Sequence, residues 1–118
     1  MEVRAIARYV PMSARKVRRV VDRVRGMGVE RALELLRLLP QAAAGPVEKV
    51  IRSAVANAEE NFGLSRDNLY IAHIVADEGP GVPPGRGWRP RFAARGRYHP
   101  IRKRSSHITV VLREIEEE

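Results

Sequence analysis

The chain has 118 residues, the size of one domain with a single small core. Its 22 Lys and Arg outnumber 14 Asp and Glu, and the net charge of +8 favours a polyanionic partner, nucleic acid before an anionic membrane or an acidic protein. The chain lacks cysteine, which excludes disulfides and cysteine-based metal sites, and with no signal peptide or long apolar stretch we expect it in the cytoplasm.

The first 25 residues predict one β-strand and one α-helix. In residues 3–10, small or apolar side chains occupy every second position, which predicts a strand with Val3 and Tyr9 on the same side. The proline that follows directly ends this strand or places it at a sheet edge. Ser13 stands in the N-cap position of a helix over about residues 14–25. Four valines recur there at i, i+3, i+4 and i+7, which indicates one buried stripe with basic side chains on the remaining surface.

Two further helices are predicted before residue 63. Over about residues 29–39 the leucines cover a broad arc, so this helix is expected to be mostly buried, and a proline ends it. The third helix is expected to begin near Pro46, a favourable first-turn residue, and to end at Gly63. Its predicted core-facing residues are Val47, Val50, Ile51, Ala54 and Ala58.

Two alternating segments predict the remaining strands. Residues 69–78 alternate, and the four expected on one side are Leu69, Ile71, His73 and Val75. Residues 106–114 alternate as well, and those expected to face inward are Ile108, Val110 and Leu112. Together these elements predict an α+β fold: three helices packed on a three-stranded antiparallel sheet, with a long protruding β-hairpin.

The single domain, residues 1–118, is expected to divide into three parts. Residues 1–78 and 106–114 would form a globular core, residues 79–105 an extended basic hairpin and residues 115–118 an acidic tail. A strand enters the basic segment and a strand leaves it, which favours the far end of one long hairpin. A disordered basic loop and a flexible linker are the alternatives.

Charge is segregated along the chain. Residues 1–25 carry a net charge of +6, residues 26–78 carry −3 and residues 79–113 carry +9 without a single carboxylate. A polyanion binder concentrates one sign where its partner docks, whereas a solvated surface mixes the signs, so we favour nucleic acid. The preference for Arg over Lys, 19 to 3, suits RNA binding, although a GC-rich or thermophilic genome produces the same preference.

The predicted hairpin carries the functional hypothesis. Its 27 residues give arms that reach about 40 Å, against a radius of gyration of about 13 Å for a domain of this size. Such a basic ribbon repels itself and is expected to be stable only among phosphates, where its aromatic residues can stack on bases. The side chains that phosphates would neutralise are Arg86, Arg89, Arg91, Arg95, Arg97, Arg102, Lys103 and Arg104.

Four motifs follow one another along nearly the whole chain. They are SARKVR at residues 13–18, SAVANA at residues 53–58, DEGP at residues 77–80 and IRKRSSHITV at residues 101–110. In this order they resemble the large-subunit ribosomal protein number twenty-two family, and the last motif alone is strongly specific. The chain departs from the family pattern in its extra Gly and Pro residues over 81–85.

The resemblance implies a non-enzymatic structural constituent of the large ribosomal subunit. It implies a hairpin that runs between RNA segments, a tip that lines the nascent-peptide exit tunnel, and a role in early assembly. The implied partners are large-subunit ribosomal RNA, neighbouring ribosomal proteins and the nascent peptide, without cofactor, membrane or small-molecule substrate. The residues expected to bind RNA are Arg8, Arg15, Lys16, Arg18, Arg19, Arg25, Arg86, Arg89, Arg91, Arg95, Arg97, Arg102, Lys103, Arg104, Ser105 and His107, and those expected at the tip are Trp88, Arg89, Pro90, Arg91, Phe92 and Ala93.

Two other functions compete with this interpretation. A free-standing regulator of DNA or messenger RNA would need base-reading Asn or Gln on the basic helix, and residues 14–25 contain none. An enzyme that acts on RNA would need a carboxylate or His cluster on the basic surface. The spacing of His73, His99 and His107 matches no metal-ligand pattern, so neither a metal site nor catalysis is expected.

Overall fold

The structure is a computed structural model that describes residues 2–79, 88–92, 98–102 and 105–115, the second and third of these ranges as backbone. Along these ranges, all the helices follow the first strand in succession, and the other four strands come after them. Their bounds are β1 Glu2–Val10, α1 Ala14–Val24, α2 Val29–Leu38, α3 Ala44–Phe62, the short 3-10 helix η1 Arg66–Asn68, β2 Leu69–Glu78, β3 Trp88–Phe92, β4 Tyr98–Arg102 and β5 Ser106–Glu114.

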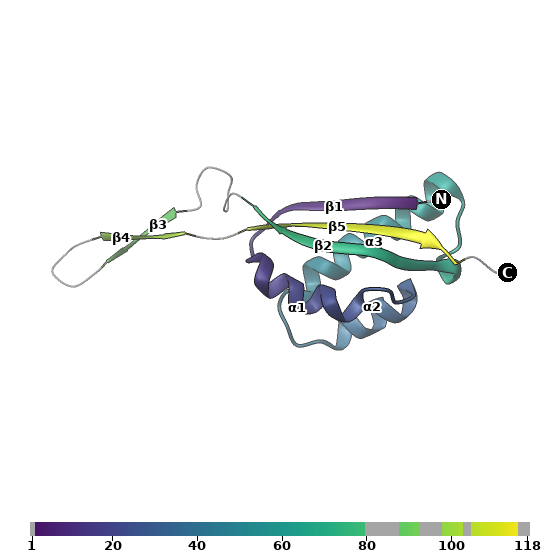
Figure 1. Cartoon of the computed structure of the whole chain (residues 1–118), viewed down its shortest axis with the longest axis horizontal. Helices are drawn as coiled ribbons and strands as arrows, with labels where there is room; N and C mark the ends of the chain where they lie inside the picture. Colours follow the sequence, from purple (N-terminus) through teal and green to yellow (C-terminus); the bar gives the residue numbers. More distant parts are fainter. Residues whose placement is uncertain (1, 80–87, 93–97, 103–104, 116–118) are drawn as a thin grey trace.

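The last strand in sequence, β5, lies in the middle of the main sheet. It pairs antiparallel with β1 on one side and with β2 on the other. The three helices lie together on one face of this sheet, with α3 against β1 and β5 and α1 against β2 (Figure 1). The predicted α+β architecture of three helices on a three-stranded antiparallel sheet is therefore confirmed.

A single apolar core fills the space between the sheet and the helices. The predicted valine stripe of α1 is fully buried, as are the inward residues of β5. Burial of each such side chain stabilises the fold by about 1.5–3 kcal/mol relative to its exposure. The largest fully buried side chains include Leu36, Ile51, Leu69, Ile71, Ile74, Ile108 and Leu112.

A β-bulge near the end of β1 reverses the predicted side of Tyr9. Ala7 pairs with Ile108 and Val10 pairs with Ser106, so β1 advances one residue more than β5 between these pairs. Val10 is buried in consequence, and the ring of Tyr9 is 42% exposed instead of lying beside Val3. Tyr9 has a φ of +55°, a left-handed conformation that costs a bulky residue on the order of 1 kcal/mol.

A second bulge, at Ala72, corrects the predicted faces of β2. Ile71 pairs with Leu112 and His73 pairs with the neighbouring Val111, which leaves Ala72 as the extra residue. Side chains after this point change faces, because strand residues alternate with a period of two. The prediction of His73 and Val75 on the inner side with Ile71 was wrong: His73 is exposed, and Ile74 and Ala76 fill the core instead.

The helices match the predicted segments with small changes at their ends. α3 begins at Ala44, two residues before Pro46, and ends at Gly63, whose φ of +64° suits a residue without a side chain. Ser13 is the N-cap of α1, but its hydroxyl makes no capping hydrogen bond. α2 is less buried than predicted, since Leu38 is 81% exposed.

The segment between β2 and β5 contains a second, two-stranded sheet. β3 pairs antiparallel with β4, from Trp88 opposite Arg102 to Phe92 opposite Tyr98. In this register positions 88, 90 and 92 share one face with positions 102, 100 and 98, and the arginines at 89 and 91 take the other. Paired strands within the basic segment agree with a hairpin; its protrusion and the division into core, hairpin and tail stay predictions.

A close backbone contact marks the start of the basic segment. The Gly79 N–H donates to the Ser105 carbonyl oxygen at 2.9 Å. A Cβ atom on Gly79 would collide with Ser105 Oγ and would lie 3.2 Å from Cε1 of His107. Position 79 therefore needs a residue without a side chain for reasons of space.

Substitution of two glycines by alanine should have opposite effects on stability. Gly79→Ala should lower the free energy of unfolding by about 1–3 kcal/mol, because the added methyl forces Ser105 to move. Gly45→Ala should raise it by up to about 1 kcal/mol, because nothing lies within 4 Å of a Cβ there and alanine favours the helix. Urea unfolding would measure both changes; an unaltered midpoint for Gly79→Ala would contradict the space argument.

Candidate nucleic-acid interface

Helix α1 presents basic side chains outward because its valines turn inward. Arg15, Lys16, Arg18 and Arg19 are all exposed. The first turn contains no acidic residue, and Asp22, the one acid of the helix, forms an ion pair with Arg25 at 2.9 Å. The helix therefore offers a continuous positive surface to a polyanion.

Two of these arginines also bind the open edge of β2. Arg18 Nε donates to the Ala76 carbonyl oxygen at 3.0 Å, and Arg25 Nη2 donates to the Ile74 carbonyl oxygen at 3.0 Å. Two backbone hydrogen bonds between the α1–α2 connection and Ile71 cover the next part of this edge. Because an uncovered strand edge invites pairing with another chain, these contacts protect β2 as well as fixing α1.

The predicted RNA-binding residues of α1 therefore divide into two groups. Arg18 and Arg25 are engaged with β2, although a guanidinium has five N–H donors and these bonds leave several of them unused. The side chains of Arg15, Lys16 and Arg19 make no hydrogen bond or ion pair with any other residue that the structure describes. The second group is the one whose charge is not used within the fold.

Arg8, Tyr9 and His107 come together beside the close contact of Gly79 and Ser105. Arg8 is exposed on β1, and the next residue, Tyr9, donates its backbone N–H to His107 Nδ1 at 3.1 Å. The rings of Tyr9 and His107 meet edge to face with centroids 5.0 Å apart. Ser105 is only 1% exposed, so the fold brings it to this place but buries it, and its contact with RNA stays a prediction.

A groove of about 470 Å³ opens between the end of β1 and the beginning of α3. Residues 6–11 line one wall, and residues 45, 46, 49, 50 and 53 line the other. Arg8 and Lys49 are its charged residues, and none of the lining residues is acidic. The groove thus has mainly apolar walls and two positive charges. Tyr9 lines it and also contacts His107.

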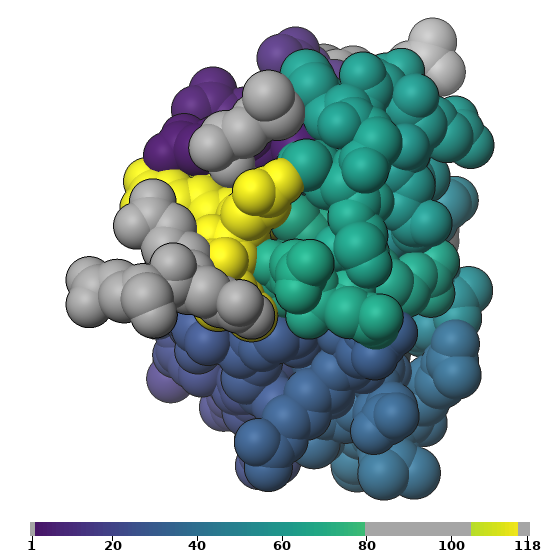
Figure 2. Space-filling model, turned by 90° about the vertical axis from the view of Figure 1, so that its right-hand side faces the viewer, coloured from purple at the N-terminus to yellow at the C-terminus, as the bar shows by residue number. Residues whose placement is uncertain are grey.

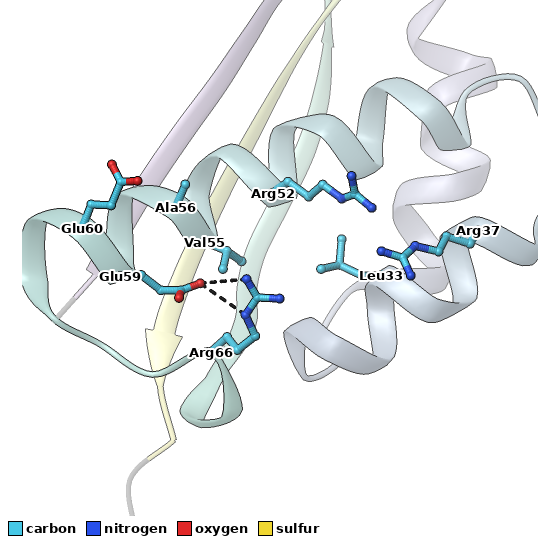
Figure 3. Close-up of a pocket in the computed structure, with 8 residues that line it drawn as sticks. All are labelled: Leu33, Arg37, Arg52, Val55, Ala56, Glu59, Glu60 and Arg66. Atoms are coloured by element: carbon cyan, nitrogen blue, oxygen red, sulfur yellow. Dashed lines mark hydrogen bonds and ion pairs between the residues drawn. The ribbon is translucent and has the colours of Figure 1, made fainter.

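The far end of the molecule has a different charge character. Figure 2 shows this end, with α2 in blue below and the connection from α3 to β2 in teal above it. A pocket of about 440 Å³ lies there, and Arg66 donates to Glu59 across it at 2.9 Å (Figure 3). Its other two arginines, Arg37 and Arg52, both bind Glu48. These guanidinium groups are consequently neutralised within the fold.

Two carboxyl groups also meet at this end. Glu30 on α2 shares a hydrogen bond with Asp67 on η1, and this bond together with the negative charge of Asp67 raises the pKa of Glu30. Two acids in contact repel a polyanion, so the mildly acidic middle of the sequence becomes a surface unsuited to phosphate. Among the described residues no group of three or more acidic or histidine side chains could hold a metal ion.

Comparison with known proteins identifies the family. The family described as Ribosomal protein L22p/L17e matches residues 5–113. The Large ribosomal subunit protein uL22 of Thermoanaerobacter sp. is 54% identical over 116 residues, which cover 98% of this chain and all of the relative. The proteins of that name from Synechococcus sp. and Chloroflexus aggregans are 53% and 52% identical, over 98% and 95% of this chain and 90% and 95% of their own lengths.

The chain belongs to the ribosomal protein L22p/L17e family. The resemblance indicated by the four motifs is thereby confirmed. As an L22p/L17e protein the chain is a structural, non-enzymatic constituent of the ribosome, and its place is the ribosome of the cytoplasm. In the part of the chain that the structure describes, no helix is both long and apolar enough to cross a membrane.

The predicted L22p/L17e site residues fall into three sets. Side chains are described for eight of them: Arg8, Arg15, Lys16, Arg18, Arg19, the C-cap residue Arg25, Ser105 and His107. The second set is placed as backbone in β3 and β4, and it comprises Trp88, Arg89, Pro90, Arg91, Phe92 and Arg102. The third set lies outside the described residues, and it comprises Arg86, Ala93, Arg95, Arg97, Lys103 and Arg104.

Sequence reasoning missed two residues of the groove. Lys49 lies in the mildly acidic middle of the chain and was therefore not singled out. The alternation of the first strand predicts Tyr9 on the same side as Val3, and only the bulge turns it to the other side. The proline that follows Val10 was the one sequence signal that the strand ends irregularly at this point.

Because Arg18 is bonded to β2 and Arg19 is not, substitution of Arg18 should affect stability more. Arg18→Met keeps the aliphatic stem but removes the hydrogen bond to Ala76, and it should lower the free energy of unfolding by about 1 kcal/mol. Arg19→Met removes the same charge from an exposed position and should change it by less than about 0.5 kcal/mol. Chemical denaturation of both variants would decide; equal effects would show that the bond to β2 contributes nothing.

Proposed function

We propose that this chain holds large-subunit ribosomal RNA through the surface of α1 and through its basic hairpin, residues 79–105. The observation that carries the proposal is a contrast between two sets of cations. Those at the far end are paired with carboxylates. Arg15, Lys16 and Arg19 have no such partner in the described part of the chain, and their charge is available for phosphate.

The α1 surface would act mainly through phosphates. Each contact of a cation with phosphate releases condensed counterions, which makes the binding strong and salt-dependent. A helix that lies on the backbone of folded RNA needs no base-reading amides, and α1 has none. Arg18 and Arg25 would join these contacts with the donors that β2 leaves unused.

The hairpin would enter the RNA and reach the wall of the nascent-peptide exit tunnel. Three features support this: segment 79–113 has no acid, β3 pairs with β4 inside it, and the motifs at 77–80 and 101–110 match the family pattern at its two ends. The tip would comprise residues 88–93. Its arginines at 89 and 91 lie on one face and could hold phosphates while residues of the other face stack on bases.

The same arrangement supports a role in early assembly of the large subunit. A basic two-stranded ribbon is marginally stable alone, so it would become ordered as the RNA closes around it. The protein and the RNA would then fix each other's shape. Neighbouring ribosomal proteins and the nascent peptide are the remaining partners that we propose.

Neutralising three unpaired cations of α1 should weaken RNA binding in a salt-dependent way. The triple variant Arg15→Gln, Lys16→Gln and Arg19→Gln should reduce the slope of log K against log salt by roughly 0.7–0.9 for each phosphate that is no longer neutralised, or about 2–3 in all. Filter binding to a transcript of large-subunit ribosomal RNA over a range of salt concentrations would measure it.

A matched control removes the same charge from the far end. The triple variant Arg31→Gln, Arg37→Gln and Arg52→Gln lowers the net charge equally but should leave the slope near that of the wild type, because Arg37 and Arg52 are paired within the fold. Equal changes in both triple variants would mean that only total charge matters, and would remove α1 from the proposed interface.

The position of the hairpin tip can be tested by photo-crosslinking in ribosomes. A benzophenone amino acid in place of Phe92 should form adducts with a nascent chain or with tunnel-wall RNA in stalled ribosomes. The same group in place of Phe62, an exposed aromatic residue at the end of α3, should form neither adduct. The absence of both kinds of adduct at position 92, in ribosomes that contain the variant, would contradict the tunnel assignment.

A further inference from the structure

Tyr9 has a strained backbone beside a groove, and this strain does not stabilise the fold. Tyr9 is the one non-glycine residue with positive φ in the described part of the chain. Asn or Gly would adopt this conformation at lower cost. Strain of this kind at a bulky residue is commonly kept for function, and here it turns the ring outward, 42% exposed, at the rim of the groove.

The orientation of the ring is fixed before any ligand arrives. The backbone N–H of Tyr9 donates to His107 Nδ1, and the two rings meet edge to face with their centroids 5.0 Å apart. His107 in turn lies next to Gly79, whose N–H is bound to Ser105. The aromatic ring is therefore preorganised and adjoins the base of the hairpin that we propose to enter RNA.

The chemistry of the groove specifies one kind of occupant. Pro11 and Pro46 give it rigid apolar walls, Arg8 and Lys49 give it two cations, and no lining residue is acidic. Proteins that bind single-stranded RNA commonly stack an unpaired base on an aromatic ring in an apolar groove and hold the phosphate with cations at its rim. An acidic peptide would satisfy the cations but would not need the exposed ring.

We propose that this groove binds one unpaired nucleotide of the ribosomal RNA, with the base stacked on Tyr9 and the phosphate held by Arg8 and Lys49. The inference rests on the proposed function, since it assumes that the chain binds this RNA. It adds a base-stacking site on the globular part, separate from the α1 surface and from the hairpin. Its contribution to affinity comes from stacking as well as from charge.

Zero-length ultraviolet crosslinking of the wild-type protein tests the site directly. The protein is bound to a transcript of large-subunit ribosomal RNA, irradiated, and digested with nuclease and trypsin. The peptide of residues 9–15 should carry a nucleotide adduct by mass spectrometry. The peptide of residues 53–66, which contains the exposed Phe62 at the far end, should carry none.

Three substitutions separate stacking from charge. Tyr9→Phe keeps the ring and should bind like the wild type. Tyr9→Asn should weaken binding roughly 5-fold to 150-fold with an unchanged salt slope, because it removes the stacking ring but no cation. The double variant Arg8→Gln and Lys49→Gln should lower the slope instead, by roughly 1.5–2.

Stability provides the control for folding. Tyr9→Asn should melt within a few degrees of the wild type, because relief of the backbone strain offsets the absence of the ring that faces His107. A ring kept only for structure would make this variant unstable and leave RNA affinity unchanged in the folded fraction. That result would overturn the inference.

The remaining outcomes distinguish the inference from the function on which it rests. If the wild type binds the RNA but the 9–15 peptide carries no adduct, or Tyr9→Asn binds as tightly as the wild type, the nucleotide site is wrong and the proposed function stands. If residues 9–15 crosslink to another ribosomal protein in purified subunits, the occupant is a protein and the site is again wrong. If the wild type does not bind the RNA, both proposals fail together.

Discussion

The pairing of β5 with both of its neighbours is the constraint on which the rest of the structure depends. β5 completes the sheet from its centre, and its first residue, Ser106, pairs with Glu78 at the end of β2. The residues between them must therefore leave the sheet and return to the same point. The contact of Gly79 with Ser105 closes this point tightly, and the whole basic segment is an excursion from one place at the end of the sheet.

The fold also decides which cations are free to act. α1 carries its arginines outward because four valines must be buried, and two of the arginines complete the hydrogen bonding of β2. At the far end carboxylates neutralise Arg37, Arg52 and Arg66. A net charge of +8 is thus distributed unevenly, and among the described residues it includes the unpaired Arg15, Lys16 and Arg19 of α1. Under the proposed function, this difference separates a surface that would hold RNA from one that would not.

Buried polar groups and a strained residue lie close together where the basic segment leaves and rejoins the sheet. Ser105 and Ser106 are buried there, and Ser106 Oγ has no hydrogen-bond partner within the described residues. His107 accepts the backbone N–H of Tyr9 and faces its ring. Polar groups that are buried or strained at one place often mark a site where a partner supplies what the isolated chain lacks. The groove adjoins this place through the contact of Tyr9, one of its lining residues, with His107.

Periodicity, composition and local motifs were enough to predict the element types, the antiparallel α+β fold, the buried valines of α1 and the family. The faces of residues beyond the two bulges could not be predicted in this way, because one extra residue in a strand reverses every later side chain and leaves no mark in the alternation. This is why His73 was placed inward and Tyr9 was overlooked. The pairing of cations was equally invisible, because the distance between Arg66 and Glu59 or between Arg25 and Ile74 depends on how helices and strands pack, not on their spacing along the chain.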